Sequence, residues 1–308
     1  MTTVLFTHPA CLAHDPGEWH PERPDRLRYV LRALEAEEFA PLLREPAPLA
    51  TREQLERVHP AAYVASILAI TPADGGRVML DADTAMSAGS AEAALRSAGG
   101  AVAAVDAVME GWARNAFVAT RPPGHHAEAA RAMGFCLFAN AAIAARHAQA
   151  RWGLGRVAVV DFDVHHGNGT QAIFETDPTL FYGSSHQFPC YPGTGSPSET
   201  GVGNVVNVAL APGSDGMAFR AAWQDVLLPA LETFAPELLI VSAGFDAHIA
   251  DPLAQLRVRT ADFQWLTERL LAVALRHCNG RLVSVLEGGY DLDALADASA
   301  AHVRALMG

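Results

Sequence analysis

The stretch VAVVDFDVHH (Val157–His166) decides the fold that we expect. Four apolar residues precede the first acid, and such a run is typical of a strand buried on both faces of a sheet. A second run of this kind, LLIVSAG (Leu238–Gly244), lies further along the chain. Strands buried on both faces favour a parallel sheet covered by helices.

Outward from this stretch, β-branched runs alternate with Ala/Leu-rich amphipathic segments over the whole chain. The expected strands are Thr3–Thr7, Ala116–Thr120, Arg156–Asp161, Thr179–Ser184, Val205–Leu210, Glu237–Ser242 and Arg281–Leu286. The expected helices are Arg23–Glu38, Thr51–Ile70, Ser87–Gly111, Asn140–Trp152, Gly216–Phe234, Thr260–His277 and Leu292–Met307. This alternation predicts a single α/β domain over residues 1–308, with an open parallel sheet and helices on both faces.

The charge of the chain restricts its partners. The 308 residues include 34 Asp and Glu against 22 Lys and Arg, a net charge of −12. A protein that binds the phosphate backbone of nucleic acid needs a basic face, so we expect no direct nucleic-acid binding. No apolar run is long enough to span a membrane. The four cysteines form no CxxC pair and no signal peptide is evident, so we expect reduced thiols in the cytoplasm.

Acids and imidazoles follow the strand at Val157. Asp163 and His165 are two residues apart, so in extended backbone their side chains point to the same side and can face one metal ion. Asp161 shares this parity and could orient a neighbouring imidazole. The alternative is a capped strand end with polar side chains in solvent, which we consider the weaker interpretation because buried acids are costly unless paired.

A third ligand is expected after the strand at Leu238. Asp246 is the candidate, His248 and Asp251 are rivals, and a helix N-cap is an alternative role for Asp246. Three protein ligands with an open fourth position are the arrangement of catalytic zinc, although two carboxylates with one histidine are a less usual set.

A pair of adjacent histidines, His125 and His126, offers acid–base capacity on a Pro-Pro-Gly turn. Structural turn histidines are the alternative interpretation. Tyr290 follows two glycines and could donate to a developing oxyanion, although a lone tyrosine in this context is more often structural.

The motifs together resemble the histone deacetylase and acetylpolyamine amidohydrolase family, in its class II-like bacterial branch. The matching strings are HPERPDRL (His20–Leu27), RPPGHH (Arg121–His126), GFCLFAN (Gly134–Asn140), DFDVHHGNGT (Asp161–Thr170), YPGTG (Tyr191–Gly195), SAGFDAH (Ser242–His248) and EGGY (Glu287–Tyr290). The resemblance implies the arginase–deacetylase fold, an open eight-stranded parallel sheet between helical layers. It also implies zinc-dependent removal of an acetyl or acyl group from acetyl-lysine-type amines, releasing acetate.

The resemblance implies a role for each matching residue. The zinc ligands would be Asp163, His165 and Asp246; the catalytic group would comprise His126 as general base and acid, His125 and Asp161 as its electrostatic support, and Tyr290 as the donor to the amide carbonyl. The walls of a substrate tunnel would be Phe135 and Tyr191, with Gly134 and Gly289. A structural potassium ion would lie at Asp161, Asp163, His165, Ser184 and Ser185, and a second monovalent cation near Phe174, Asp177 and Leu180.

Two positions leave questions open. Asn168 stands where class I members carry an aspartate, so His126 should have a lower pKa than beside a carboxylate, and which histidine transfers the proton stays undecided. Arg26 resembles an arginine that guards an internal acetate channel, with a surface charge as the alternative.

Three rival functions remain. A binuclear manganese ureohydrolase would need bridging carboxylates where Gly167 and His248 stand. An acetylpolyamine or small-amide deacetylase would use the same site, and a non-catalytic module would only bind acylated ligands. The physiological substrate, the acyl-chain preference and the oligomeric state are left open.

Overall fold

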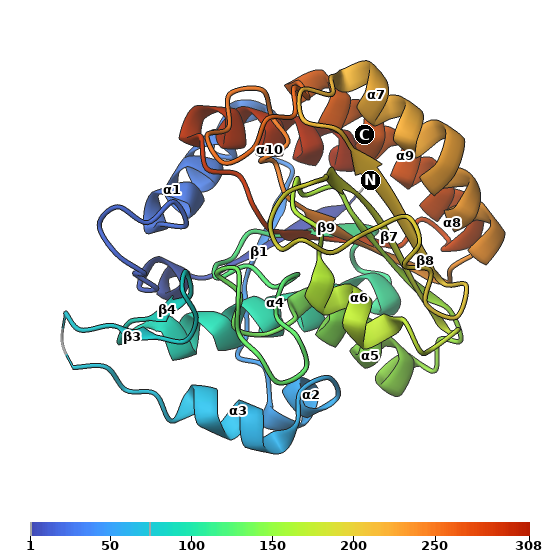
Figure 1. Ribbon diagram of the computed structural model, residues 1–308. Coiled ribbons are helices and arrows are strands. Elements are labelled where there is room, and N and C mark those ends of the chain that lie inside the picture. The colour runs from blue at the N-terminus through green and yellow to red at the C-terminus, as the bar shows by residue number, and fades with distance from the viewer. Residues whose placement is uncertain (1, 74) are drawn as a thin grey trace.

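The computed structural model describes residues 2–73 and 75–308, so Met1 and Asp74 of the predicted domain lie outside the described residues. Eight strands form one open sheet in the order β2-β1-β5-β10-β9-β6-β7-β8, and every neighbouring pair is parallel (Figure 1). This sheet confirms the predicted fold class. Its strands are β1 (Thr3–Thr7), β2 (Leu43–Pro46), β5 (Asn115–Val118), β6 (Val157–Asp161), β7 (Leu180–Gln187), β8 (Val205–Leu210), β9 (Leu238–Ala243) and β10 (Leu282–Leu286).

Helices cover both faces of the sheet (Figure 1). One layer holds α1 (Pro24–Ala33), α7 (Gly216–Ala221), α8 (Leu228–Phe234), α9 (Thr260–His277) and α10 (Leu292–Met307). The other holds α4 (Ser90–Glu110), α5 (Asn140–Trp152) and α6 (Asn168–Phe174), flanked by α2 (Arg52–Glu56) and α3 (Ala61–Leu68).

Side-chain alternation along β6 shows how one strand serves both layers. Ala158 and Val160 belong to the hydrophobic core beneath α9 and α10, whereas Val157 and Val159 belong to the core beneath α4 and α5. Because successive residues of a strand point to opposite faces, a strand covered on both sides must be apolar throughout. This explains the continuous apolar runs in the sequence.

The structure departs from the expected elements in several places. The expected helix at 216–234 is α7 and α8 with a π-helical segment, Ala222–Leu227, between them. The edge strand β2 was not predicted, because all four of its residues are exposed and its sequence LREP carries no apolar run. The expected helix at 51–70 is two helices, α2 and α3, with Pro60 directly before α3. The helix α6, which begins at Asn168, is absent from the expected helices. A short antiparallel pair, β3 (Val78–Met79) and β4 (Ala85–Met86), was also missed.

The strand order explains why the polar motifs meet. The four central neighbours are β5, β10, β9 and β6, and each motif follows one of them. Since all strands are parallel, their carboxyl ends lie along one edge, which is where open α/β sheets place their sites. The segments after these strands are 121–126, 287–290, 244–248 and 162–166.

Candidate active site

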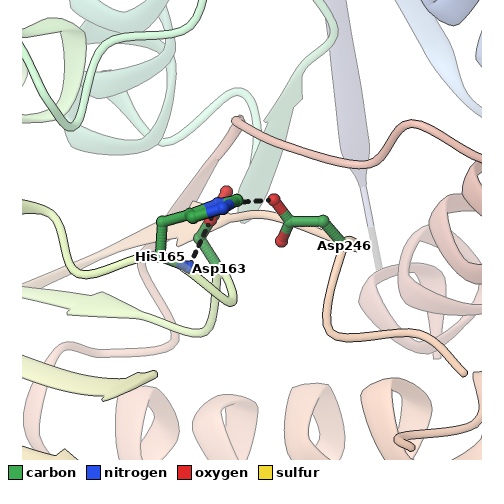
Figure 2. Close-up of side chains that lie close together, drawn as sticks. All are labelled: Asp163, His165 and Asp246. Carbon is green, nitrogen blue, oxygen red and sulfur yellow. Dashed lines mark hydrogen bonds and ion pairs between the residues drawn. The ribbon is translucent and has the colours of Figure 1, made fainter. Parts of the chain in front are cut away.

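Two carboxylates and one imidazole converge at the carboxyl ends of β6 and β9. The Nδ1 atom of His165 lies 3.2 Å from Oδ1 of Asp163 and 3.1 Å from Oδ2 of Asp246. Figure 2 shows the three side chains pointing toward one another. One ligand atom from each lies within 4.8 Å of the others, so the group could hold a metal ion. All three residues are buried.

Two glycines make room for this convergence. A Cβ atom on Gly244 would lie 2.0 Å from Oδ2 of Asp163, and one on Gly288 would lie 2.1 Å from Oδ2 of Asp246. The backbone of Gly288 also donates a hydrogen bond to Asp163 at 2.8 Å. Any side chain at either position would therefore push a carboxylate out of the group.

The two buried carboxylates of this group favour the binding of a cation. Burial and the neighbouring Asp163 raise the pKa of Asp246 to about 7. Burial alone would also raise the pKa of Asp163, but the His125 charge and the contacts from His165 hold it below its ordinary value. Two adjacent buried carboxylates are stable only when they are compensated, and a metal ion provides that compensation. The donor set therefore fits a divalent cation.

The rival third ligands lie elsewhere. Asp251 accepts hydrogen bonds from the backbone of Tyr290 (2.7 Å) and Leu253 (3.0 Å). The imidazole of His248 accepts from the backbone of Ala250 and stacks on Phe263. Within residues 2–73 and 75–308, the only grouping of His, Cys, Asp and Glu with metal-site geometry is Asp163, His165 and Asp246.

His125 is a buried imidazole between two acids. Its Nδ1 lies 3.0 Å from Oδ2 of Asp161, and its Nε2 lies 3.8 Å from Oδ2 of Asp163. Burial opposes the charged form, but the two carboxylates prevail and raise the pKa of His125 to about 10. Asp161 thus lies within hydrogen-bonding distance of a neighbouring imidazole.

His126 has a neutral partner instead. Its Nδ1 lies 2.9 Å from Oδ1 of Asn168, while the Asn168 amide nitrogen donates to the carboxylate of Glu128 at 2.9 Å. The carboxylate of Glu128 can only accept hydrogen bonds, so it must face the NH₂ group of Asn168. The amide oxygen of Asn168 therefore faces His126. Nδ1 of a neutral His126 therefore carries the proton, and Nε2 is left as the basic nitrogen. Burial and the charges of His125 and His165 lower the pKa of His126 well below its usual value.

A cavity of about 240 Å³ leads to this group. It is lined by Asp83, His126, Gly134, Phe135, His165, Tyr191, Leu253 and Tyr290. Sequence reasoning missed Asp83, in the turn between β3 and β4, and Leu253, in the segment between β9 and α9, because neither belongs to a recognisable motif. Gly289, expected in the tunnel wall, is not among these residues, and its carbonyl accepts from Nε of Arg26 at 2.6 Å.

The arginine at position 26 is fully buried, so its interpretation as a surface charge is wrong. Its guanidinium lies 4.8 Å from the centroid of the Tyr290 ring and donates to the Glu287 carbonyl at 2.5 Å. Glu22 pairs with it at 3.0 Å and also with Arg121. This buried ion cluster, which the sequence did not reveal, packs against the ring of Tyr290 through Arg26.

Glu287 links the histidine turn to the end of β10. One carboxylate oxygen accepts from the backbone of Gly124 (2.7 Å) and His125 (3.2 Å), and the other from the Ser242 hydroxyl (3.3 Å). Burial raises the pKa of Glu287 to about 7. The acid of the EGGY motif therefore ties three of the four central strand ends together.

The residues expected at a structural potassium ion lie next to one another. Asp161 of β6 pairs with Ser184 of β7 in the sheet register. The Ser184 hydroxyl contacts His186 at 2.9 Å, and the Ser185 hydroxyl accepts from Trp223 at 2.9 Å. Both hydroxyls are thus engaged within the protein.

Comparison with known proteins places this geometry in one family. The histone deacetylase domain model matches residues 20–306. "Histone deacetylase-like amidohydrolase" of Pseudomonas aeruginosa is 43% identical and aligns with 94% of this chain and 81% of its own length. "Histone deacetylase 14, chloroplastic" of Arabidopsis thaliana is 39% identical over 99% of this chain and 77% of its own.

Solved structures agree with the sequence relatives. The "Crystal Structure of HDA15 HD domain" superposes with a TM-score of 0.92 at 35% identity, covering 100% of this chain and 90% of the other. In the described part of the chain, no helix has the length and apolar character needed to cross a bilayer. The chain belongs to the histone deacetylase family of deacetylases, which are hydrolases.

Proposed function

We propose that the chain forms one zinc-dependent deacetylase domain over residues 1–308, which removes an acetyl or acyl group from acetyl-lysine-type amines. The observation that carries this proposal is the convergence of the Asp163, His165 and Asp246 donors beside His126 at one cavity, with Tyr290 in its wall.

One zinc ion fits the donor set best. Asp163, His165 and Asp246 would hold it, since an imidazole with carboxylates suits zinc, whereas magnesium prefers oxygen ligands alone. The chemistry that zinc supplies in such a site is Lewis acidity, which lowers the pKa of water and polarises an amide carbonyl. The finding of a single grouping favours one metal over the binuclear ureohydrolase alternative.

The proton steps belong to the chain's own residues. Nε2 of His126 accepts the proton of the attacking water, because its Nδ1–H is committed to Asn168. The Tyr290 hydroxyl donates to the carbonyl oxygen as that oxygen becomes negative. His126 then returns the proton to the departing amine, so acetate and free amine are released. His125, held by Asp161, keeps positive charge beside the site.

The cavity favours an acylated lysine side chain over an acetylated polyamine as substrate. Phe135, Tyr191 and Leu253 supply apolar walls that suit the methylene chain of an acylated lysine, whereas a polyamine would need acids for each ammonium group. Among the described residues that line the cavity, Asp83 alone carries a carboxylate. An acetylpolyamine remains the alternative substrate.

A structural potassium ion at Asp161, Asp163, His165, Ser184 and Ser185 also remains a proposal. It would use main-chain carbonyls, given that the two serine hydroxyls are already engaged. The cytoplasmic location stays a prediction, and two relatives are described as chloroplastic.

Turnover on two substrate classes tests the proposed function. Acetate release would be measured on an acetyl-lysine peptide and on N-acetylspermidine, with zinc supplied, for the wild type and His126→Ala. We expect a higher kcat/KM on the peptide and a loss of about 10²–10⁴-fold in the variant. His59→Ala is a matched control, since His59 is buried away from the cavity and contacts Ala129 and Ala139. If neither substrate released acetate, the proposal would be contradicted. A higher kcat/KM on N-acetylspermidine than on the peptide would select the alternative substrate.

A further inference from the structure

The side chain of Asn204, the residue directly before β8, lies where three main-chain carbonyl oxygens converge. Its amide nitrogen is 2.8 Å from the oxygen of Phe174, 2.9 Å from that of Asp177 and 2.7 Å from that of Leu180. We call these three oxygens the carbonyl cage. It lies far from the candidate active site along the sheet, because Leu180 begins β7 and Asp161, at the carboxyl end of β6, pairs with Ser184.

The orientation of the Asn204 amide follows from its surroundings. Its Oδ1 accepts from the backbone of Val202 at 3.2 Å, so the nitrogen is the atom that must face the cage. Asn204 is only 4% exposed. A Cβ atom on Gly201 would lie 2.6 Å from this Oδ1, so the turn is shaped around the amide. A half-turn of the amide would place its oxygen against three carbonyl oxygens and its NH₂ group against the Val202 N–H, which exchanges four hydrogen bonds for repulsive contacts.

The carbonyl cage coincides with the place where the family resemblance implies a second monovalent cation. Rings of main-chain carbonyls are the environment in which such ions replace their hydration shell. Here the space at equal distance from the three oxygens is filled by nitrogen. The carboxylate of Asp177 offers no additional ligand, because it contacts Arg146 (2.5 Å) and Thr179 (2.6 Å). The residues present therefore do not fit the ion.

We infer that the Asn204 side chain takes the place of a monovalent cation in this chain, so that the carbonyl cage binds no potassium or sodium ion while the side chain is present. The two N–H groups satisfy two carbonyls and share the third, which a neutral amide can do without any counter-charge. The presence of an amide in place of an ion has a structural consequence. It ties the last residue of α6 to the start of β7 and to β8 without an ion, and α6 begins at Asn168, the partner of His126. The inference does not rest on the proposed substrate or on the catalytic metal.

Thallium(I), a strongly scattering substitute for potassium, tests the inference directly. Crystals of the wild type soaked in thallium acetate should show no anomalous peak within the carbonyl cage. Crystals of Asn204→Ala should show a peak there, because removal of the amide opens the space that the three carbonyl oxygens face. A peak between the three carbonyls in the wild type, with the Asn204 side chain displaced, would overturn the inference without reference to any variant.

Thermal unfolding gives an independent measurement. Melting temperatures would be compared in potassium chloride and in tetramethylammonium chloride at equal ionic strength. Asn204→Ala should melt roughly 3–10 °C below the wild type in tetramethylammonium, because several buried hydrogen bonds are lost, and potassium should restore part of this difference. Asn115→Ala is the matched control, since Asn115 is also buried and its amide donates to the Leu306 carbonyl at 2.8 Å, on the strand β5 away from β7 and β8.

The control should show the same potassium-dependent shift as the wild type, whatever other potassium sites exist. An equal shift for Asn204→Ala and the wild type would overturn the inference. Failure of Asn204→Ala to fold in tetramethylammonium but not in potassium would support it. If that variant folds in neither salt, the wild-type thallium measurement decides.

Discussion

The two adjacent histidines differ because their partners differ. His125 lies between the carboxylates of Asp161 and Asp163, whereas Nδ1 of His126 meets the neutral amide of Asn168. A carboxylate stabilises imidazolium more than an amide does, so His125 keeps the charge and His126 stays available as a base. The sequence predicted a lowered pKa for His126 from Asn168 alone. It could not reveal that Glu128 turns that amide and so determines which nitrogen is basic.

Substitution of Tyr290 by phenylalanine tests the donor role of its hydroxyl. We expect kcat on an acetyl-lysine peptide to fall about 10²–10³-fold with little change in KM, as when one oxyanion donor is lost. The ring would still pack against Arg26, so the melting temperature should stay close to that of the wild type. Wild-type turnover in Tyr290→Phe would remove the hydroxyl from the mechanism.

Glu287 offers a comparison between charge and hydrogen-bond acceptance. In Glu287→Ala the backbone N–H groups of Gly124 and His125 lose their acceptor, so we expect kcat to fall about tenfold or more while KM changes little. Glu287→Gln keeps an acceptor oxygen at the same reach and should retain kcat within a few-fold. Steady-state kinetics on one acetyl-lysine peptide would measure both, and loss of activity in Glu287→Gln would show that the charge matters instead.

At the scale of the elements, prediction succeeded where the apolar pattern was strong. The ranges of α5, α9 and α10 match the expected segments, because each has a full amphipathic period and clear ends. The edge strand β2 and the helix α6 were missed for the opposite reason. All residues of β2 are exposed, and α6 begins with Asn168 and Gly169, which are poor helix formers.

The site was predictable to the extent that its residues follow strands. Asp163, Asp246 and Tyr290 come after β6, β9 and β10, and parallel strands bring their carboxyl ends to one edge. Asp83 and Leu253 line the same cavity from loops whose paths depend on tertiary contacts, so no local pattern indicated them. Gly289 was assigned to the wall by resemblance, but its carbonyl bonds to Arg26.

Packing between α9, α10 and β10 makes stability depend on pH. His302 is fully buried between Thr267 (2.7 Å) and Ser284 (2.8 Å), and burial lowers its pKa from 6.5 to about 3. Below pH 6.5 the unfolded chain takes up this proton before the folded chain does, so the stability that neutral His302 provides is lost as the pH falls toward 3.

Urea unfolding between pH 7.5 and 4.5 would measure this dependence. Relative to His302→Gln, the wild type should lose more unfolding free energy on acidification, by up to about 1.4 kcal/mol per pH unit below pH 6.5. The variant is expected to be less stable at every pH because Phe117, Phe162 and Phe245 pack around the ring. If the unfolding free energies of the two proteins changed equally with pH, the assignment of this pH dependence to His302 would be contradicted.

Across the whole molecule, the metal group joins parts of the chain that are distant in sequence. Asp163 and Asp246 follow neighbouring strands in the middle of the sheet, and the buried charge of Asp246 opposes folding until a cation compensates it. A ligand that binds only the folded state stabilises it by mass action. We therefore expect zinc at one hundred times its Kd to add about 2.7 kcal/mol to the unfolding free energy of the chelator-treated protein.

Thermal or urea unfolding with and without zinc would test this expectation. Magnesium at the same concentration is the control, and it should stabilise less because one of the three ligands is an imidazole. Equal effects of the two ions, or no effect of zinc, would contradict a zinc site within the fold.

Metal analysis of the zinc-reconstituted protein tests the central claim most directly. The wild type should carry one zinc per chain. Asp246→Asn should bind no zinc and should release no acetate from the substrate. Asp251→Asn, which changes the acid that was the rival candidate for the third ligand, should retain the zinc ion. Stoichiometric zinc of unchanged affinity in Asp246→Asn would contradict the assignment of Asp163, His165 and Asp246 as the metal group.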